Sequence, residues 1–120
     1  MIWPWLYMTN SATIARVLVA DDHVAILAQV RNVLAAEFEI VGAVTNGPDL
    51  IKAAMKIDPD VVVLDITMPG LDGIEVSRRL RRTGCRAKLV FLTVHEDPDY
   101  VRTAMQSGGS AYVTKARMAS

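Results

Sequence analysis

The sequence has a single cysteine, no excess of charge of either sign and no long hydrophobic run. Cys85 alone cannot form an intramolecular disulfide or a cysteine-rich metal site, and this usage is typical of a reducing cytosol. Thirteen basic residues balance thirteen acidic residues, so the net charge gives no reason to expect binding to nucleic acid or to an anionic membrane. No apolar run approaches the roughly 18 residues that a membrane span requires. We therefore expect a cytoplasmic protein whose charged site is local.

The first fifteen residues differ from the rest of the chain. Residues 1–8 are apolar, but this run is short, lacks a basic start and precedes the polar residues 9–11, so we do not interpret it as a signal peptide. We interpret residues 1–15 as an N-terminal appendage and residues 16–120 as one domain, because the length leaves no room for a second one.

From residue 16 onward, short β-branched runs alternate with segments of helical period. This alternation is typical of repeated βα units and predicts an α/β fold with a parallel sheet. Runs three and four are apolar almost throughout, as expected of central strands covered on both faces. Five strands are predicted, at residues 16–20, 38–44, 61–64, 88–92 and 111–113.

Helices are predicted between the strands. The first two span residues 24–36 and 47–56, each with one apolar stripe. The third begins after Asp72, with Glu75 completing a capping box, and runs to about residue 82. The fourth has Asp97 as its cap and ends at residues 107–109. After Lys115 only five residues remain, so we expect the last covering helix of such a fold to be missing and an apolar patch to be left on the sheet.

Polar side chains follow the apolar runs at the positions where an open parallel sheet binds ligands. Asp21 and Asp22 follow the first run, Asp65 the third, Thr93 the fourth, and Lys115 comes shortly after the fifth. In the doubly wound strand order 2-1-3-4-5, the three carboxylates share one edge of the sheet.

Two ionised carboxylates about 5 Å apart repel by roughly 3 kcal/mol at an effective dielectric near 20, so three together require a proton or a cation. A ligand set of oxygens alone points to Mg²⁺, with Mn²⁺ as the alternative. A cation, a carboxylate, a hydroxyl and an ammonium together can support phosphoryl transfer to an aspartate.

Four motifs carry a family resemblance, at residues 19–23 (VADDH), 63–73 (VLDITMPGLDG), 92–95 (LTVH) and 111–115 (AYVTK). In this order they resemble the motifs of CheY-like response-regulator receiver domains, over residues 16–116. The resemblance implies a flavodoxin-like fold and a signalling switch of a bacterial two-component system.

The resemblance also implies residue roles. A sensor histidine kinase passes a phosphoryl group to Asp65. The domain catalyses at most its own phosphorylation and dephosphorylation and is not an enzyme. Asp21, Asp22, Asp65 and the carbonyl of Thr67 hold Mg²⁺. Further roles are phosphoryl binding by Thr93, charge pairing by Lys115, a rotamer change of Tyr112, and control of phosphoryl lifetime by His95.

Residues 92–101 look most like receivers that precede a LuxR-type helix-turn-helix domain. We therefore hypothesise a DNA-binding output domain beyond Ser120 and a role in transcription regulation. A homodimer through the fourth helix and fifth strand is the family expectation. A second hypothesis is that Ile2, Trp3, Trp5 and Leu6 cover the apolar patch or join two chains.

Simpler interpretations remain open at single positions. Asp22 can be a helix cap, Thr93 a satisfied hydroxyl, Lys115 a solvated lysine and Tyr112 sheet packing. We expect His23 to be a surface residue without a site. The arginines of the third helix are interpreted as a solvated face, and they are Arg78, Arg79, Arg81 and Arg82.

Three other functions share parts of the pattern. An aspartate-nucleophile phosphatase lacks support because no second acidic residue stands two positions after Asp65. The chain is also short for a cap domain that covers the substrate. An FMN carrier would need a phosphate-cradling loop after the first strand, which the sequence does not have. A degenerate receiver that acts only as an interaction module is opposed by the presence of Asp65, Thr93 and Lys115.

Overall fold

The computed structural model describes residues 14–94 and 97–118. The apolar appendage residues Ile2, Trp3, Trp5 and Leu6, and also His95, lie outside the described residues. Five parallel strands form one sheet in the order β2-β1-β3-β4-β5, which confirms the predicted topology. The strands are β1 (Arg16–Ala20), β2 (Glu39–Val44), β3 (Val61–Leu64), β4 (Lys88–Thr93) and β5 (Ala111–Thr114).

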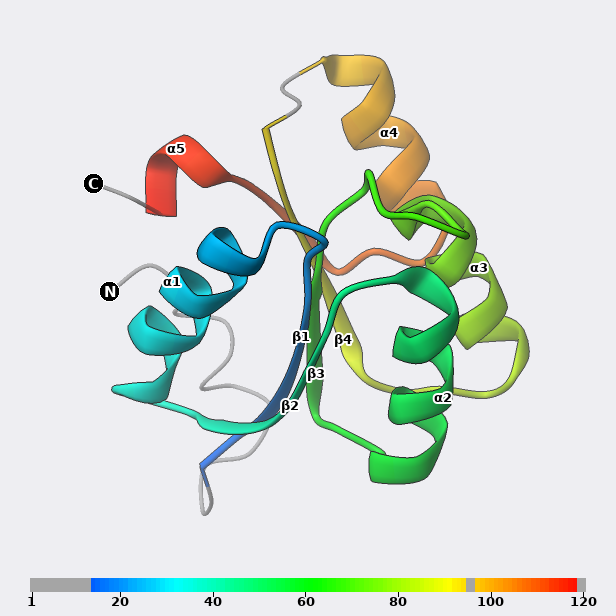
Figure 1. The fold of residues 1–120 in the computed structure, drawn as a ribbon. Helices are drawn as coiled ribbons and strands as arrows, with labels where there is room; N and C mark the ends of the chain where they lie inside the picture. Colours follow the sequence, from blue (N-terminus) through cyan, green and yellow to red (C-terminus); the bar gives the residue numbers. More distant parts are fainter. Residues whose placement is uncertain (1–13, 95–96, 119–120) are drawn as a thin grey trace.

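Helices cover both faces of this sheet (Figure 1). Two of them, α1 (Val24–Ala35) and α5 (Lys115–Met118), lie on one side. The other side is covered by α2 (Gly47–Ile57), α3 (Gly73–Arg82) and α4 (Pro98–Gln106). Since α5 is a single turn of four residues, the described chain has no full-length last helix, as the sequence predicts. No helix in the described ranges is long and apolar enough to cross a membrane.

The strand boundaries differ slightly from the prediction, for local reasons. The amide of Phe38 donates to the carbonyl of Leu34, so Phe38 ends the turn after α1 and β2 begins one residue later than predicted. At the other end, β4 and β5 each run one residue further, because Thr93 and Thr114 are still paired in the sheet. The extra pair brings Thr93 of β4 beside the residue that precedes Lys115.

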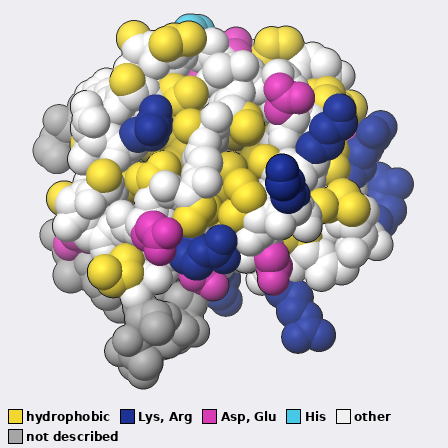
Figure 2. Space-filling model, turned by 60° about the horizontal axis from the view of Figure 1, so that its bottom comes forward, with side chains coloured by type: hydrophobic (Ala, Val, Ile, Leu, Met, Phe, Trp, Pro, Cys, Tyr) yellow, Lys and Arg dark blue, Asp and Glu magenta, His cyan; other side chains and the backbone are white. Residues whose placement is uncertain are grey.

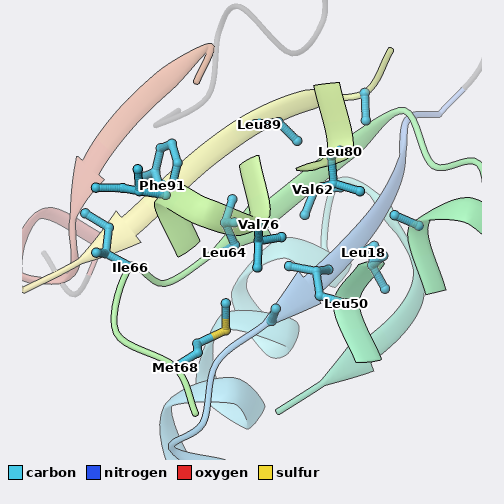
Figure 3. Close-up of a cluster of buried hydrophobic side chains, with 14 of the residues drawn as sticks. Leu18, Leu50, Val62, Leu64, Ile66, Met68, Val76, Leu80, Leu89 and Phe91 are labelled. Carbon is cyan, nitrogen blue, oxygen red and sulfur yellow. The ribbon is translucent and has the colours of Figure 1, made fainter. Parts of the chain in front are cut away.

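The core is divided by the sheet into two clusters. On the side of α2 and α3, strand residues such as Leu18 and Leu64 pack against Leu50 of α2 and Leu80 of α3 (Figure 3). On the side of α1, Val17, Val63 and Leu92 belong to the second cluster. Because β1, β3 and β4 are buried on both faces, the positions of their carboxyl ends are fixed by the core.

Aspartate side chains cap the N-termini of α3 and α4. The side chain of Asp72 accepts a hydrogen bond of 2.9 Å from the amide of Glu75, and Asp97 accepts one of 2.8 Å from the amide of Asp99. The carboxylate of Glu75 bonds with Arg79 and Arg82. These contacts confirm Asp72 and Asp97 as the caps of α3 and α4.

The interpretation of all four arginines as a solvated face was wrong for Arg81. Its guanidinium donates to the carbonyls of Cys85, Ala87 and Gly108, at 2.8–3.1 Å. Periodicity could not reveal this, because the acceptors are backbone carbonyls in the loops before β4 and β5, and Gly108 lies 27 residues away. Arg81 therefore ties α3 to the loops that enter β4 and β5.

The edge of the sheet opposite the carboxyl ends is shown in Figure 2, where hydrophobic side chains gather between lysine and arginine side chains. A hollow of about 720 Å³ lies near the start of β3 and β4. It is lined by Asp58, Pro59, Asp60, Gly84, Arg86, Ala87 and Lys88. The predicted site residues belong to the other edge, so this hollow is not the candidate site.

Candidate functional site at the carboxyl edge of the sheet

Asp21 and Asp65 are set by the adjacent strands β1 and β3. The amide of Asp65 donates to the carbonyl of Ala20, and the amide of Asp21 donates to the carbonyl of Val44, each at 3.1 Å. The ladder thus continues one step past the strand ends and brings both carboxylates to one edge. Asp21 is 2% exposed and Asp65 is 5% exposed, so two acidic groups are buried side by side.

The turn after β3 holds Asp65 in place. Its Oδ1 accepts hydrogen bonds from the amides of Ile66, at 2.7 Å, and Thr67, at 3.4 Å. The loop returns closely, since the amide of Gly73 donates to the carbonyl of Ile66 at 2.6 Å. A Cβ at Gly73 would collide with the carbonyl oxygen of Asp65. Gly73 is therefore needed for α3 to begin against the strand that presents Asp65.

Lys115 joins the two buried carboxylates. Its Nζ lies 2.7 Å from Oδ2 of Asp21 and 3.1 Å from Oδ2 of Asp65, and its side chain is only 12% exposed. Burial lowers the pKa of Lys115, but the hydrogen bonds to Asp21 and Asp65 outweigh burial and raise it above its ordinary value. The ammonium is therefore charged at neutral pH, and the simpler interpretation of Lys115 as a solvated lysine is wrong.

Asp22 and His23 complete the acidic edge. Nδ1 of His23 lies 3.2 Å from Oδ1 of Asp22 and 3.4 Å from Oδ1 of Asp21. The imidazole is 63% exposed, and the side chain of Asp22 is 28% exposed. Despite the short distance, Oδ1 of Asp22 is buried and has no hydrogen-bond partner. The contact with the imidazole is therefore close but does not form a hydrogen bond.

This arrangement fits a divalent cation. Ligand atoms of Asp21, Asp22, His23 and Asp65 all lie within 4.8 Å of one another. A buried carboxylate oxygen without a partner costs free energy unless a proton or a cation compensates it. Among the residues that the structure describes at this edge, the Lys115 ammonium faces three carboxylates, which leaves a deficit of positive charge that a divalent ion can balance.

Thr93 and Tyr112 lie beside this edge. Thr93 is fully buried at the end of β4, opposite Thr114 in the register. Tyr112 is half-buried and pairs with Phe91, with ring centroids 6.4 Å apart. Because side chains on a strand alternate between faces, Thr93 and Phe91 share the face on which Tyr112 packs.

The structure places Asp21, Asp22, Asp65 and Lys115 together, as the sequence predicts. Thr67 is exposed, and its amide contacts Asp65. His23 lies at the surface, as predicted. The prediction does not include the contact of its Nδ1 with the carboxylates of Asp21 and Asp22. The adjacency of Asp21, Asp22 and His23 in the sequence is the signal that could have found it.

Comparisons with known proteins agree with this geometry. The family model described as the response regulator receiver domain matches residues 17–119. Response regulator GacA of Pseudomonas aeruginosa is 37% identical over 102 residues, which is 83% of this chain and 48% of the relative. Response regulator UvrY of Escherichia coli K12 is 34% identical, over 82% of this chain and 46% of the relative. The chain thus spans about half the length of these curated relatives.

Solved structures are also similar. The signal receiver domain of the putative response regulator NarL from Mycobacterium tuberculosis aligns with a TM-score of 0.82 and 29% identity, over 85% of this chain and 84% of that one. A LuxR-family DNA-binding response regulator from Staphylococcus aureus aligns with a TM-score of 0.81 and 30% identity, over 86% of this chain and 88% of that one.

Proposed function

Because the chain belongs to the family of response regulator receiver domains, we propose that it is a phosphorylation-dependent switch of a two-component system with Asp65 as its phosphoacceptor. The observation that carries the proposal is the Lys115 ammonium between the carboxylates of Asp21 and Asp65. A cation at this position neutralises part of the charge that a phosphoryl group on Asp65 would bring. Intact Asp65, Thr93 and Lys115 favour this function over a degenerate receiver.

The proposed donor is a phosphohistidine of a sensor kinase. A carboxylate oxygen of Asp65 attacks phosphorus, the P–N bond breaks, and the imidazole leaves and takes up a proton. The product is an acyl phosphate on Asp65. Phosphoryl transfer depends mainly on alignment and on neutralisation of charge, and the fixed position of Asp65 beside Lys115 supports both. In self-catalysed phosphorylation from acetyl phosphate, the same carboxylate oxygen attacks phosphorus, a P–O bond breaks and acetate leaves.

We propose Mg²⁺, or Mn²⁺ in its place, as the cofactor. Asp21, Asp22, Asp65 and the carbonyl of Thr67 would hold it, and the unpartnered oxygen of Asp22 supports this assignment. When bound, the ion supplies neutralisation of charge on the phosphoryl oxygens. The two amide contacts to Oδ1 of Asp65 keep the carboxylate in one orientation during the reaction.

The proposed signal passes through Thr93 and Tyr112. The hydroxyl of Thr93 moves toward the phosphoryl oxygens, Tyr112 changes its rotamer, and the surface of α4 and β5 is altered. This surface is also the proposed homodimer contact. Two observations support this route: Thr93 and Tyr112 lie on the same face of the sheet, and the ring of Tyr112 pairs with that of Phe91. NMR signals of the Tyr112 ring test this route. Phosphorylation of wild type is expected to shift them. The same shift in a phosphorylated Thr93→Val variant would contradict the route.

We propose that the output is control of transcription through a DNA-binding domain outside this chain. Similarity to a LuxR-family DNA-binding response regulator and the roughly half coverage of the curated relatives support this. The proposed location is the cytoplasm. The role of His95 in phosphoryl lifetime also remains a proposal, because His95 lies outside the described residues.

Incubation with acetyl phosphate and Mg²⁺, followed by intact mass measurement, tests the phosphoacceptor. Wild type gains one phosphoryl group, and Asp65→Asn gains none. Asp99→Asn, at an exposed position on α4, is the matched control and behaves as wild type. Addition to Asp65→Asn contradicts the assignment of Asp65. Sustained release of phosphate from a generic phosphomonoester would instead support a phosphatase.

A further inference from the structure

The acidic edge has a nitrogen ligand candidate that the proposed role of Mg²⁺ does not use. His23 follows the pair Asp21–Asp22 directly and is the N-cap residue of α1. Its side chain makes no capping hydrogen bond to the helix. Instead, Nδ1 lies 3.2 Å and 3.4 Å from one oxygen of each neighbouring aspartate. The imidazole is therefore directed to the acidic edge and not to the amides of its own helix.

The distances between these atoms suit ligands of one ion. Two donors that each lie about 2.1 Å from a cation at right angles are about 3.0 Å apart. The separations of Nδ1 from the two carboxylate oxygens are close to this value. Oδ1 of Asp22 is near Nδ1 but forms no hydrogen bond with it. Two ligands of one ion can lie at such a separation without a hydrogen bond between them.

The chemistry of the donors then determines which ion is favoured. Carboxylate and carbonyl oxygens suit Mg²⁺ and Mn²⁺ alike, whereas imidazole nitrogen favours first-row transition metals over Mg²⁺. We propose that His23 Nδ1 is a ligand that makes this site prefer a divalent transition metal such as Mn²⁺ over Mg²⁺. The inference rests on the proposed function, because it assigns the ion at the same phosphoacceptor site.

Exposure of the imidazole is compatible with this role. His23 stands at the rim of the site, so it can ligate an ion without losing its contact with solvent. The buried members, Asp21 and Asp65, are anchored by backbone hydrogen bonds. Substitution of His23 removes a nitrogen donor and leaves these anchors in place, since the hydrogen bond from His23 to Asp21 uses the backbone amide.

Titration calorimetry with Mn²⁺ and with Mg²⁺ tests the preference in the full chain. We expect the affinity for Mn²⁺ to fall about tenfold or more in His23→Phe, and the affinity for Mg²⁺ to change less than about twofold. His95→Phe removes the other histidine of the sequence and retains the preference. An unchanged ratio of the two affinities in His23→Phe, or a loss of preference in His95→Phe only, overturns the inference.

Pulsed electron paramagnetic resonance of bound Mn²⁺ gives an independent measurement. Modulation from an imidazole nitrogen is expected in wild type and in His95→Phe, and is lost in His23→Phe. Should His23→Phe fail to fold, His23→Ala replaces it in both experiments, with thermal unfolding as the check. Binding of Mg²⁺ and phosphorylation without a nitrogen signal contradicts this inference alone, whereas failure to bind either ion together with failure of phosphorylation contradicts the proposed function.

Discussion

Lys115 reaches Asp21 across the sheet, with its Nζ 2.7 Å from Oδ2 of the carboxylate. Lys115 follows β5, while Asp21 follows β1, and β3 and β4 lie between these strands. The same ammonium contacts Asp65 at the end of β3. A long side chain that directly follows one edge strand therefore reaches two buried carboxylates near the middle of the sheet and balances part of their charge.

Removal of the Lys115 charge is expected to slow phosphorylation. In Lys115→Met the phosphoryl group arrives next to carboxylates with no ammonium to compensate it, and the loss of one such electrostatic contact costs about a hundredfold in rate. The rate of mass gain with acetyl phosphate and Mg²⁺ measures this. Lys88→Met, at an exposed position that starts β4, is the control. Equal rates for Lys115→Met and wild type would show that the ammonium does not act in the reaction.

The Lys115 ion pair also makes stability depend on pH in the alkaline range. Because the pKa of Lys115 in the folded protein lies above its ordinary value of 10.5, the stabilisation is complete below that value. It is lost as the pH rises through the folded-state pKa. Urea unfolding at a neutral pH and at several alkaline values therefore shows a steeper loss in wild type than in Lys115→Met. Parallel curves for the two proteins contradict the pairing.

Gly73 is expected to tolerate no side chain. In Gly73→Ala the new Cβ meets the carbonyl oxygen of Asp65, so the strand end must shift. We expect a loss of more than about 2 kcal/mol in the free energy of unfolding, together with slower phosphorylation. Gly84→Ala is the matched control, since Gly84 has φ +87° but open space around it. Its cost is about 1 kcal/mol with phosphorylation retained. Similar effects of both variants on phosphorylation would contradict a specific role for Gly73.

Arg81 is expected to matter for stability far more than its helix neighbours. In Arg81→Met the carbonyls of Cys85, Ala87 and Gly108 lose their donor, and we expect a cost of about 2–3 kcal/mol. Arg78→Met, at an exposed position with a 3.6 Å contact to Glu75, costs less than about 0.5 kcal/mol. Denaturant unfolding of both variants measures the difference. Equal stabilities would contradict the structural role of Arg81.

The fold and the carboxylate cluster could be predicted because both follow from local sequence. Apolar runs identified the strands, and the residues directly after them, Asp21 and Asp65, identified the site. The strand order then follows from the family of folds, and it brings the carboxyl ends of β1 and β3 together.

Contacts that depend on side-chain direction or on how a loop packs could not be predicted in the same way. The carbonyls that bind Arg81 come from two loops, and their position depends on how α3 packs on the sheet. The direction of the His23 imidazole depends on one side-chain rotamer at the start of α1, which no periodicity reports. The sequence predicts that the second strand begins at Phe38, but the amide of Phe38 completes the turn after α1.

Chemical localisation of the phosphoryl group tests the central claim most directly. The protein is phosphorylated with acetyl phosphate and Mg²⁺, treated with sodium borohydride, which reduces an aspartyl phosphate to homoserine, and digested for peptide sequencing by mass spectrometry. The account predicts homoserine at position 65 and at no other aspartate. Homoserine at position 21 or 22, or its absence from a protein that has gained one phosphoryl group, would contradict it.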